Sequence, residues 1–397
     1  MSPSAFDRNL RVSLAVMAGS PIEERSISSD SLKQMEQSPE QSPSPLFPSL
    51  PDDVTVDIVA RVPISRYPTL SLVSRTFRKL IASPKLYKRR SQLGITEHRV
   101  YALLYNRSTG DSRFHVLHRK PNSRNRLVVV GSLPPMSSIG SFVPVGSKTY
   151  VFNNLESLSI DFASHTVQSI PGMPQRMINN VASAVDGKVY LIGDSYCSFS
   201  DEDGSSGEGW MKAVMVFDTE AQTWEPVMVK HDLPYGDLWS DSAVMEGKLF
   251  FKSFRNQHAF AYEPREDKWE LKEVLNAKEW KGACVVDDVL YYHDRSGKAG
   301  VLMAFDPTKQ SPCWSVVNGL EEFFAVEETD RSRVVKCGEK MLALFFTKIH
   351  DAKKKVLCCA EIALGRRQGE IWDKVLSCDV VFEDGLFDMV KCASVTV

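Results

Sequence analysis

A strand–turn–strand pattern recurs along most of this chain of 397 residues. Each copy has an apolar strand, a tight turn with Gly or Asp, and a second apolar strand. The copies read VPVGSKTYVF (143–152), ASAVDGKVYLIG (182–193), SAVMEGKLFFKS (242–253), ACVVDDVLYYHD (283–294) and VKCGEKMLALFF (335–346). Short apolar runs of this kind are typical of strands, and Gly supplies the positive φ that a tight hairpin needs. The series therefore predicts a repeat architecture built from hairpins.

Each hairpin is followed by a third strand that ends in an acidic residue and a fourth strand led by an aromatic residue. The clearest cases read VFDTEAQTW (216–224), AYEPREDKW (261–269) and AFDPTKQSPCW (304–314), and a looser one reads EIALGRRQGEIW (361–372). Four strands per unit, at a spacing of about 40 to 60 residues, indicate the blades of a β-propeller. We expect the large aromatic residue of each unit, such as Trp224, to pack against the next blade.

This series resembles the kelch repeat, so the expected fold is mainly β, with a kelch-like β-propeller. The diglycine that usually follows the second strand of a kelch repeat is replaced here by Gly193-Asp194, Ser253-Phe254 and His293-Asp294. A degenerate first unit over 100–133 would bring the count to about six blades, although five or seven also fit. The final segment, 389–397, is expected to close the ring on the first blade, because an open propeller leaves two unpaired edges.

A segment ahead of the repeats, 50–81, has the period of helices instead of strands. Pro51 suits a first helical turn, where its missing N–H costs nothing, and the two acidic residues after it face the positive end of the helix dipole. Apolar residues then recur at helical spacing up to Val62, and Pro63 ends the run. Ser74 is expected to cap a last helix. The apolar stripe of that helix consists of Phe77, Leu80 and Ile81.

The order of residues in this segment resembles an F-box. The matching positions are Leu50-Pro51-Asp52, Ile58, Val62-Pro63, Leu72-Val73-Ser74 and Phe77-Arg78. The family more often has Cys and Trp where Ser74 and Phe77 stand, and Leu at position 62. The resemblance implies docking on a Skp-type adaptor through Leu50, Pro51, Val54, Ile58, Val59, Val62, Pro63, Leu70, Leu72, Val73, Phe77, Leu80 and Ile81. A helical hairpin packed on its own domain would show the same period, because a segment this short needs another surface to bury its apolar residues.

Together, the two resemblances place the chain in an F-box/kelch-repeat family that is abundant in plants. They imply a substrate receptor of a cullin-RING ubiquitin ligase, in which the F-box joins the Skp-type adaptor and the propeller holds a protein target. A propeller enzyme and a non-degradative scaffold with an adaptor-binding module are the alternatives. The expected division is a disordered tail rich in Ser, Pro, Glu and Gln (1–45), an F-box (46–92) and a propeller (98–397).

Composition argues against several classes of partner. A net charge of −2 with 25% charged residues gives no field that would favour nucleic acid or a membrane surface. No apolar run approaches the roughly 18 residues of a membrane span. The 8 cysteines all follow residue 190 and contain no C-x-x-C pair. This usage suits a reducing compartment, so we expect a cytoplasmic or nuclear protein without nucleic-acid or membrane partners.

The sequence shows no clear pattern of catalytic or metal-binding residues. His115 and His118 stand three residues apart in a predicted strand, which sends them to opposite faces. The acidic segment 200–210 lacks the alternating oxygen ligands and the terminal Glu of a calcium loop. We therefore expect no cofactor, no metal and no catalytic residue, which predicts that the chain is not an enzyme.

The loops before each first strand and after each second strand converge on one face of a propeller, the usual place for a ligand. Arginines and aromatic residues there are expected to dominate a binding surface. In kelch proteins that resemble this chain, arginines at such positions hold acidic peptide groups. The candidate target-binding residues are Arg176, Asn179, Tyr196, Trp239, Arg255, Trp280, Arg295 and Arg331, with Lys281 and Arg333 close by in sequence. Taken singly, each could instead be a rim charge or an aromatic residue between blades.

Overall fold

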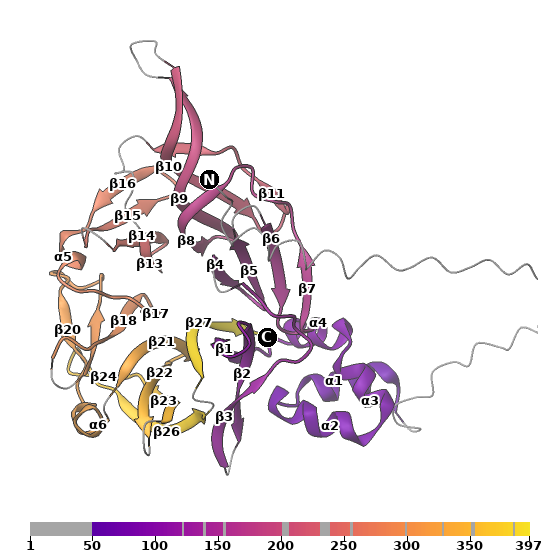
Figure 1. Cartoon of the computed structure of the whole chain (residues 1–397). Coiled ribbons are helices and arrows are strands. Elements are labelled where there is room, and N and C mark those ends of the chain that lie inside the picture. Colours follow the sequence, from indigo (N-terminus) through magenta and orange to yellow (C-terminus); the bar gives the residue numbers. More distant parts are fainter. Residues whose placement is uncertain are drawn as a thin grey trace, which may run out of the picture. The chain divides into compact units, whose positions relative to one another are not determined.

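The computed structural model describes residues 50–120, 123–137, 140–153, 156–200, 206–230, 239–254, 257–297, 300–327, 329–350, 354–383 and 386–397. The predicted disordered tail, 1–45, lies outside these residues. A helical module leads into a ring of β-sheets (Figure 1). The predicted fold class, a mainly β propeller preceded by a small all-α module, is confirmed.

The helical module is built from short helices, two of which begin at a serine cap. Its elements are α1 (Asp52–Ala60), η2 (Ile64–Arg66), α2 (Tyr67–Val73), α3 (Arg75–Ile81) and α4 (Pro84–Gln92). The Oγ of Ser74 accepts a hydrogen bond from the Phe77 N–H at 3.1 Å, which confirms the predicted cap of α3. Ser83 caps α4 in the same manner, with 3.2 Å between its Oγ and the Lys85 nitrogen.

Apart from one two-stranded sheet, the described strands of the ring form six sheets of four or five strands, which are the blades of the propeller (Figure 1). Blade 1 contains β27 (Phe387–Thr396), β1 (His98–Asn106), β2 (Ser112–Lys120) and β3 (Ser123–Val129). Blade 2 contains β4 (Ser141–Val145), β5 (Lys148–Asn153), β6 (Glu156–Asp161) and β7 (Thr166–Ser169). Blade 3 contains β8 (Met177–Val185), β9 (Lys188–Ser200), β10 (Ser206–Asp218), β11 (Thr223–Trp224) and β12 (Met228–Lys230).

The remaining three blades follow the same antiparallel order. Blade 4 contains β13 (Trp239–Met245), β14 (Lys248–Ser253), β15 (Ala259–Glu263) and β16 (Lys268–Leu271). Blade 5 contains β17 (Cys284–Val286), β18 (Val289–Asp294), β19 (Val301–Phe305) and β20 (Trp314–Val316). Blade 6 contains β21 (Asp330–Gly338), β22 (Met341–His350), β23 (Lys354–Ala363) and β26 (Lys374–Phe382). Smaller elements are α5 (Glu273–Asn276), α6 (Glu321–Val326), β24 (Arg366–Arg367) and β25 (Glu370–Ile371).

The C-terminal strand closes the ring. β27 pairs antiparallel with β1, with Tyr101 opposite Ala393 and His98 opposite Thr396. Figure 1 shows the yellow β27 beside the purple β1, although the two strands lie at opposite ends of the sequence. The pairing confirms the predicted closure, and the described sheets give six blades instead of five or seven. The pairing thus joins the two ends of the propeller segment within one blade.

Two of the predicted hairpin turns have the backbone conformation that their sequences require. Asp186 and Gly187 have φ angles of 49° and 76°, and Glu246 and Gly247 have 50° and 71°. Positive φ at both central residues defines a type I′ turn, whose twist matches that of the flanking strands. These turns lie where a first strand returns as a second, on the face of the propeller opposite the loops predicted to bind a target.

The aromatic residues at the fourth strands serve packing between blades, but in the direction opposite to the one predicted. Trp224 of blade 3 packs at 5.5 Å from the ring of Phe152, which belongs to blade 2. Trp269 and Trp314 likewise join apolar clusters shared with the preceding blade. The indole lies against its own third strand, 5.0 Å from the ring of Phe217 in the case of Trp224, and from there it reaches back to the earlier sheet. The prediction of contact with the next blade is therefore wrong.

A buried arginine forms the polar link between the helical module and the ring. Arg90 is 1% exposed, and its guanidinium donates to the Ala60 carbonyl at 2.8 Å and to Glu97 Oε1 at 2.7 Å. The same Glu97 oxygen accepts from the Ile64 N–H at 3.0 Å. The backbone of Glu97 exchanges hydrogen bonds with Val397, the residue after the ring-closing strand. Helices, linker and ring closure therefore share one hydrogen-bond network.

Candidate functional site

The helical module leaves five large apolar side chains exposed, and we call them the helical apolar surface. Val54 and Ile58 stand four residues apart on one face of α1, and Leu50 lies two residues before that helix; the three side chains are 39%, 47% and 37% exposed. Leu72 and Val73 end α2 and are 77% and 65% exposed. Apolar residues with this much exposure on so short a module indicate a protein-binding surface.

The other predicted adaptor-binding residues lie deeper. Val59, Phe77 and Leu80 are buried in a core that also contains Tyr101 and Phe114 of blade 1. Val62, Leu70 and Ile81 are partly buried against the same core, whereas Pro51 and Pro63 are exposed. The periodic apolar pattern therefore does two things: one part holds the module on the ring, and another part faces outward.

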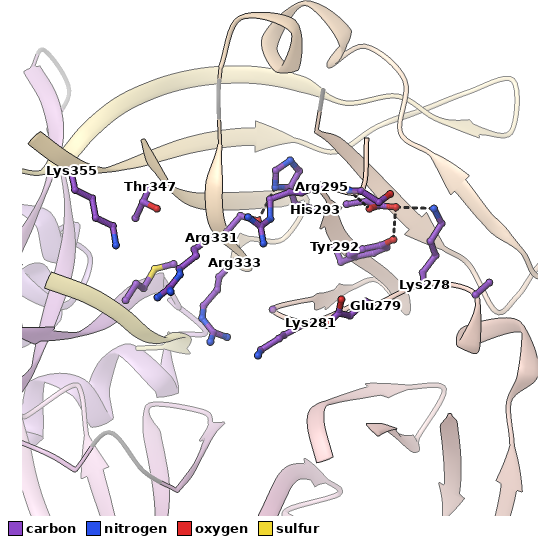
Figure 2. Close-up of a pocket in the computed structure, with 16 residues that line it drawn as sticks. Lys278, Glu279, Lys281, Tyr292, His293, Arg295, Arg331, Arg333, Thr347 and Lys355 are labelled. Carbon is purple, nitrogen blue, oxygen red and sulfur yellow. Dashed lines mark hydrogen bonds and ion pairs between the residues drawn. The ribbon is translucent and has the colours of Figure 1, made fainter. Parts of the chain in front are cut away.

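A pocket of about 820 Å³ opens on the ring face where first strands begin and second strands end (Figure 2). It lies between blades 5 and 6 and reaches Met389 at the start of β27. Most of its charged side chains are cationic, and we call it the basic pocket. Those charged residues are Lys278, Lys281, Arg295, Arg331, Arg333 and Lys355, with Glu279 and Asp294. The excess of positive charge favours an anionic ligand.

Asp294 is committed to its neighbours and adds little free negative charge. Lys278 Nζ lies 2.8 Å from Asp294 Oδ2, and the Tyr292 hydroxyl donates to the same oxygen at 2.9 Å. Burial raises the pKa of the Asp294 carboxyl, but the ion pair with Lys278 and the hydrogen bonds from Ser296 and Tyr292 outweigh burial and hold this pKa well below its usual range. The carboxylate is therefore ionised, and its oxygens are bound by neighbouring groups in the wall of the pocket.

A second carboxylate beside the pocket positions two of its cations. Asp388 accepts two hydrogen bonds of 2.7 Å from the Arg107 guanidinium, and its Oδ1 lies 3.4 Å from Arg331 and 3.3 Å from Lys355. The hydrogen bond from Arg107, helped by Lys355, holds the pKa of the Asp388 carboxyl below its usual range. Asp388 thus fixes the side of the pocket that blades 1 and 6 share.

A second cavity, of about 530 Å³, follows the innermost strands and marks the central channel. Its wall mixes small apolar residues with polar ones, and Ser183 Oγ donates to Ser242 Oγ at 2.9 Å from one blade to the next. Gly282 and Arg333 line both cavities, so the basic pocket opens toward the mouth of the channel.

Comparison with known proteins bears on both regions. Residues 47–89 match the family model of the F-box domain, and residues 114–382 match that of the "FKB95, Kelch-repeats domain". The chain belongs to the F-box/kelch-repeat family. It is 39% identical over 376 residues to the F-box/kelch-repeat protein At4g38940 of Arabidopsis thaliana, covering 90% of this chain and 97% of that protein. It is also 34% identical over 390 residues to the putative F-box/kelch-repeat protein At3g10510 of the same plant, covering 90% and 98%.

Two of the predicted target-binding residues of this F-box/kelch-repeat protein come together. Arg295 and Arg331 both line the basic pocket, as do the nearby Lys281 and Arg333 (Figure 2). Arg295 follows the second strand of blade 5, and Arg331 lies in the first strand of blade 6. The structure thus brings together side chains from the two kinds of segment that the repeat pattern singled out.

Three other predicted residues have structural roles in the F-box/kelch-repeat ring. Trp280 is fully buried between blades 4 and 5, so its side chain has no surface to offer a ligand. Trp239 is 8% exposed and lies 5.2 Å beneath the Lys212 ammonium, which forms a buried ion pair of 2.6 Å with Asp194. Asn179 donates to the other oxygen of Asp194 at 3.0 Å. Trp239 and Asn179 therefore support this buried pair.

The last three predicted residues lie apart from the basic pocket. Tyr196 is half-exposed and packs edge-on at 5.8 Å from Trp210, on the part of the β9–β10 hairpin that extends past its pairing with β8. Arg176 is exposed in the segment before β8. Arg255 lies outside the described residues.

Sequence reasoning missed three residues that shape the pocket and the channel mouth, and it treated a fourth, Lys355, only as part of a basic run (353–355) of a kind that is usually solvated. The three are Lys278, Asp388 and Lys391. None of them stands at a position that repeats from blade to blade, so the periodic pattern carried no signal for them. Only the meeting of blades 5, 6 and 1 brings them near one another.

The described residues contain neither a cluster of metal ligands nor a membrane-spanning helix. No group of three or more His, Cys, Asp and Glu side chains is placed there so that it could hold a metal ion. Among the helices in the described ranges, none has the length and apolar character needed to cross a membrane.

Proposed function

We propose that this chain is the substrate-recognition subunit of a Skp–cullin–F-box ubiquitin ligase, with no catalytic residue of its own. The F-box would dock on a Skp-type adaptor, and the propeller would hold a protein target for ubiquitination in the cytoplasm or nucleus. The observation that carries this proposal is the pairing of an exposed apolar surface on the F-box with a separate charged pocket on the ring. One chain thereby offers two surfaces of different chemistry to two partners.

The helical apolar surface supports the adaptor half of the proposal. Leu72 and Val73 are the most exposed apolar residues of the described F-box, and a partner helix that covered them would remove their side chains from water. The buried residues of the module, such as Phe77, would act indirectly by holding α3 in place. We therefore assign direct adaptor contact to Leu50, Val54, Ile58, Leu72 and Val73, and a supporting role to the rest.

The basic pocket supports the target half. Arginines with planar, rigid forks are well suited to bind carboxylate or phosphate groups of a target, and Arg295 and Arg331 face the same opening. The receptor would raise the local concentration of the target beside a ubiquitin-charged conjugating enzyme, so its contribution is proximity.

Capture of a purified Skp-type adaptor by the full chain tests the docking claim. Replacing Ile58 and Leu72 by Asp in one variant places two charges on the helical apolar surface and should abolish capture. The matched control replaces Val316 and Leu376 by Asp, because these propeller residues are also exposed, at 49% and 54%. The control should capture the adaptor as the wild type does. Capture by the Ile58→Asp, Leu72→Asp variant with unchanged affinity would reject the F-box assignment of these residues.

A further inference from the structure

The mouth of the central channel holds three cationic side chains that come from three different blades. Lys281 precedes the first strand of blade 5, Arg333 lies in the first strand of blade 6, and Lys391 lies in the ring-closing strand of blade 1. None of the three side chains has a hydrogen bond or ion pair with a described residue, and that of Lys281 only lies over the Phe254 ring, at 5.8 Å. Figure 2 shows the side chains of Lys281 and Arg333 entering the same space.

The group is electrostatically unfavourable as it stands. Burial lowers the pKa of the Lys391 ammonium, and the charges of Arg333 and Lys281 lower it further. Asp241 opposes these effects, but it is the one carboxylate facing the three cations among the described residues that bear on Lys391. Its Oδ2 also accepts a hydrogen bond of 2.6 Å from the Gly282 N–H, and its Oδ1 accepts one of 3.0 Å from the Ser242 N–H. Like charges brought together away from bulk water are costly unless an anion compensates them.

The arrangement of the three cations indicates which class of anion would bind between them. A carboxylate carries one charge and two oxygens in a plane, which matches a single arginine fork. A phosphate group carries a charge of about −1.5 to −2 and offers three acceptor oxygens that point in different directions. Three cationic donors that approach from three blades suit the second geometry. The adjoining basic pocket, with Arg295, Arg331 and Lys355, leaves room for whatever bears the phosphate.

We propose that Lys281, Arg333 and Lys391 form a binding site for a phosphate group at the mouth of the channel. The phosphate would be borne either by a side chain of the target or by a free small molecule. If a target bears the phosphate, the targets are phosphorylated proteins, and this inference rests on the proposed receptor function. Binding of phosphate itself does not depend on the F-box, so the adaptor capture described above fails or succeeds independently of it.

Calorimetric titration of the full chain with inorganic pyrophosphate at low ionic strength tests the site. The wild type should bind one equivalent, and an Arg333→Ala, Lys391→Ala variant should bind about tenfold or more weakly. A matched control replaces Arg265 and Lys248, one arginine and one lysine on the opposite face, by Ala. That control should bind as the wild type does. If the strand substitution in β27 impairs folding, Lys281→Ala, in an exposed segment, should still weaken binding.

Three results would overturn the proposal. They are absence of binding by the wild type at about 10 mM pyrophosphate, equal weakening in the control variant, and equally tight binding of the dicarboxylate succinate. The source of the phosphate follows from a second arm, in which a phosphoserine peptide library and its dephosphorylated copy are passed over the immobilised chain. Retention of the phosphorylated library alone, reversed by pyrophosphate, identifies a side chain of a target. Pyrophosphate binding without peptide retention identifies a free small phosphate. Either outcome supports the site.

Discussion

The F-box and the pocketed face of the propeller differ in the kind of surface that each offers. The F-box exposes apolar residues on short consecutive helices, with Leu72 exposed by 77%. The propeller face gathers cations from segments that are far apart in the chain, such as Lys278 and Lys391. An apolar surface made by neighbouring residues suits one constant partner, whereas a pocket made of loops and strand ends can change without altering the scaffold. The comparison predicts two independent binding events with different physical signatures.

Charge reversal on the propeller should give the largest effect that separates the two surfaces. In a variant with Arg295→Glu and Arg331→Glu, the basic pocket loses two cations and gains two anions, so most targets found by proximity labelling should disappear. Adaptor capture should remain, because the helical apolar surface is unchanged. The matched control reverses Arg265 and Lys248 to Glu on the opposite face and should keep the same labelled proteins. Loss of the adaptor together with the targets would contradict the independence of the two surfaces.

The buried arginine at the junction tests whether the two regions nevertheless fold as one. Arg90→Met removes the hydrogen bonds to Ala60, Val62 and Glu97. We expect the free energy of unfolding to fall by about 2–3 kcal/mol, because the buried carbonyls lose their donors. Urea unfolding followed by tryptophan fluorescence and by far-UV circular dichroism measures this. Coincident transitions that shift together are expected; a shift confined to one probe would show that the module unfolds separately.

A buried carboxyl in the propeller should make the stability of the protein depend on pH, whereas binding through the helical apolar surface should not depend on pH. Asp373 is 5% exposed, and its carboxyl accepts a hydrogen bond of 3.3 Å from the Gly365 N–H. Burial raises the pKa of Asp373 to about 7, so the folded state binds a proton that the unfolded state releases above about pH 4. Stability is therefore lost as the pH rises from about 4 to about 7, and the loss stays constant above that.

Asp373→Asn removes this titration while keeping an acceptor for the Gly365 N–H. The variant should be more stable than the wild type by about 1–2 kcal/mol near pH 8, because no buried charge remains, and the advantage should shrink toward pH 4. Thermal unfolding across this range measures the difference, and adaptor capture should not change. An advantage that did not vary with pH would mean that Asp373 does not titrate as described.

Salt should affect binding at the two surfaces differently, although this effect is smaller than those above. Raising the ionic strength from about 0.05 M to about 0.5 M shortens the screening length severalfold, so binding of pyrophosphate at the channel mouth should weaken by about tenfold. Adaptor capture through Leu72 and Ile58 should change little, because burial of apolar surface is not screened. Equal salt sensitivity of the two events, measured by calorimetry, would remove the distinction between them.

Local and periodic signals explain why much of this fold was predictable. The turns at Asp186-Gly187 and Glu246-Gly247 and the cap at Ser74 follow from short-range sequence patterns, and the closing strand follows from the need of a repeat ring to close. Exposure does not follow from such patterns. Trp280 stands in a loop that was predicted to face a ligand, yet it is fully buried, because its neighbours in space come from the adjoining blade.

The basic pocket also contains residues whose place in the structure the sequence pattern does not predict. Lys355 and Asp388 lie 33 positions apart in the sequence and belong to different blades, yet their side chains meet at 3.3 Å. No period links such positions, since each blade contributes a different residue to the face. The sequence therefore predicts where a binding face should be, whereas the identity of the residues that build it depends on how the ring closes.

Proximity labelling with three forms of the chain tests the central claim, that the F-box and the propeller serve different partners. The forms are the wild type, the Ile58→Asp, Leu72→Asp variant and the Arg295→Glu, Arg331→Glu variant. We predict a set of proteins that is labelled by the wild type, accumulates and stays labelled with the F-box variant, and is lost with the pocket variant. If the F-box variant loses the same proteins as the pocket variant, or the pocket variant loses none, the account is contradicted.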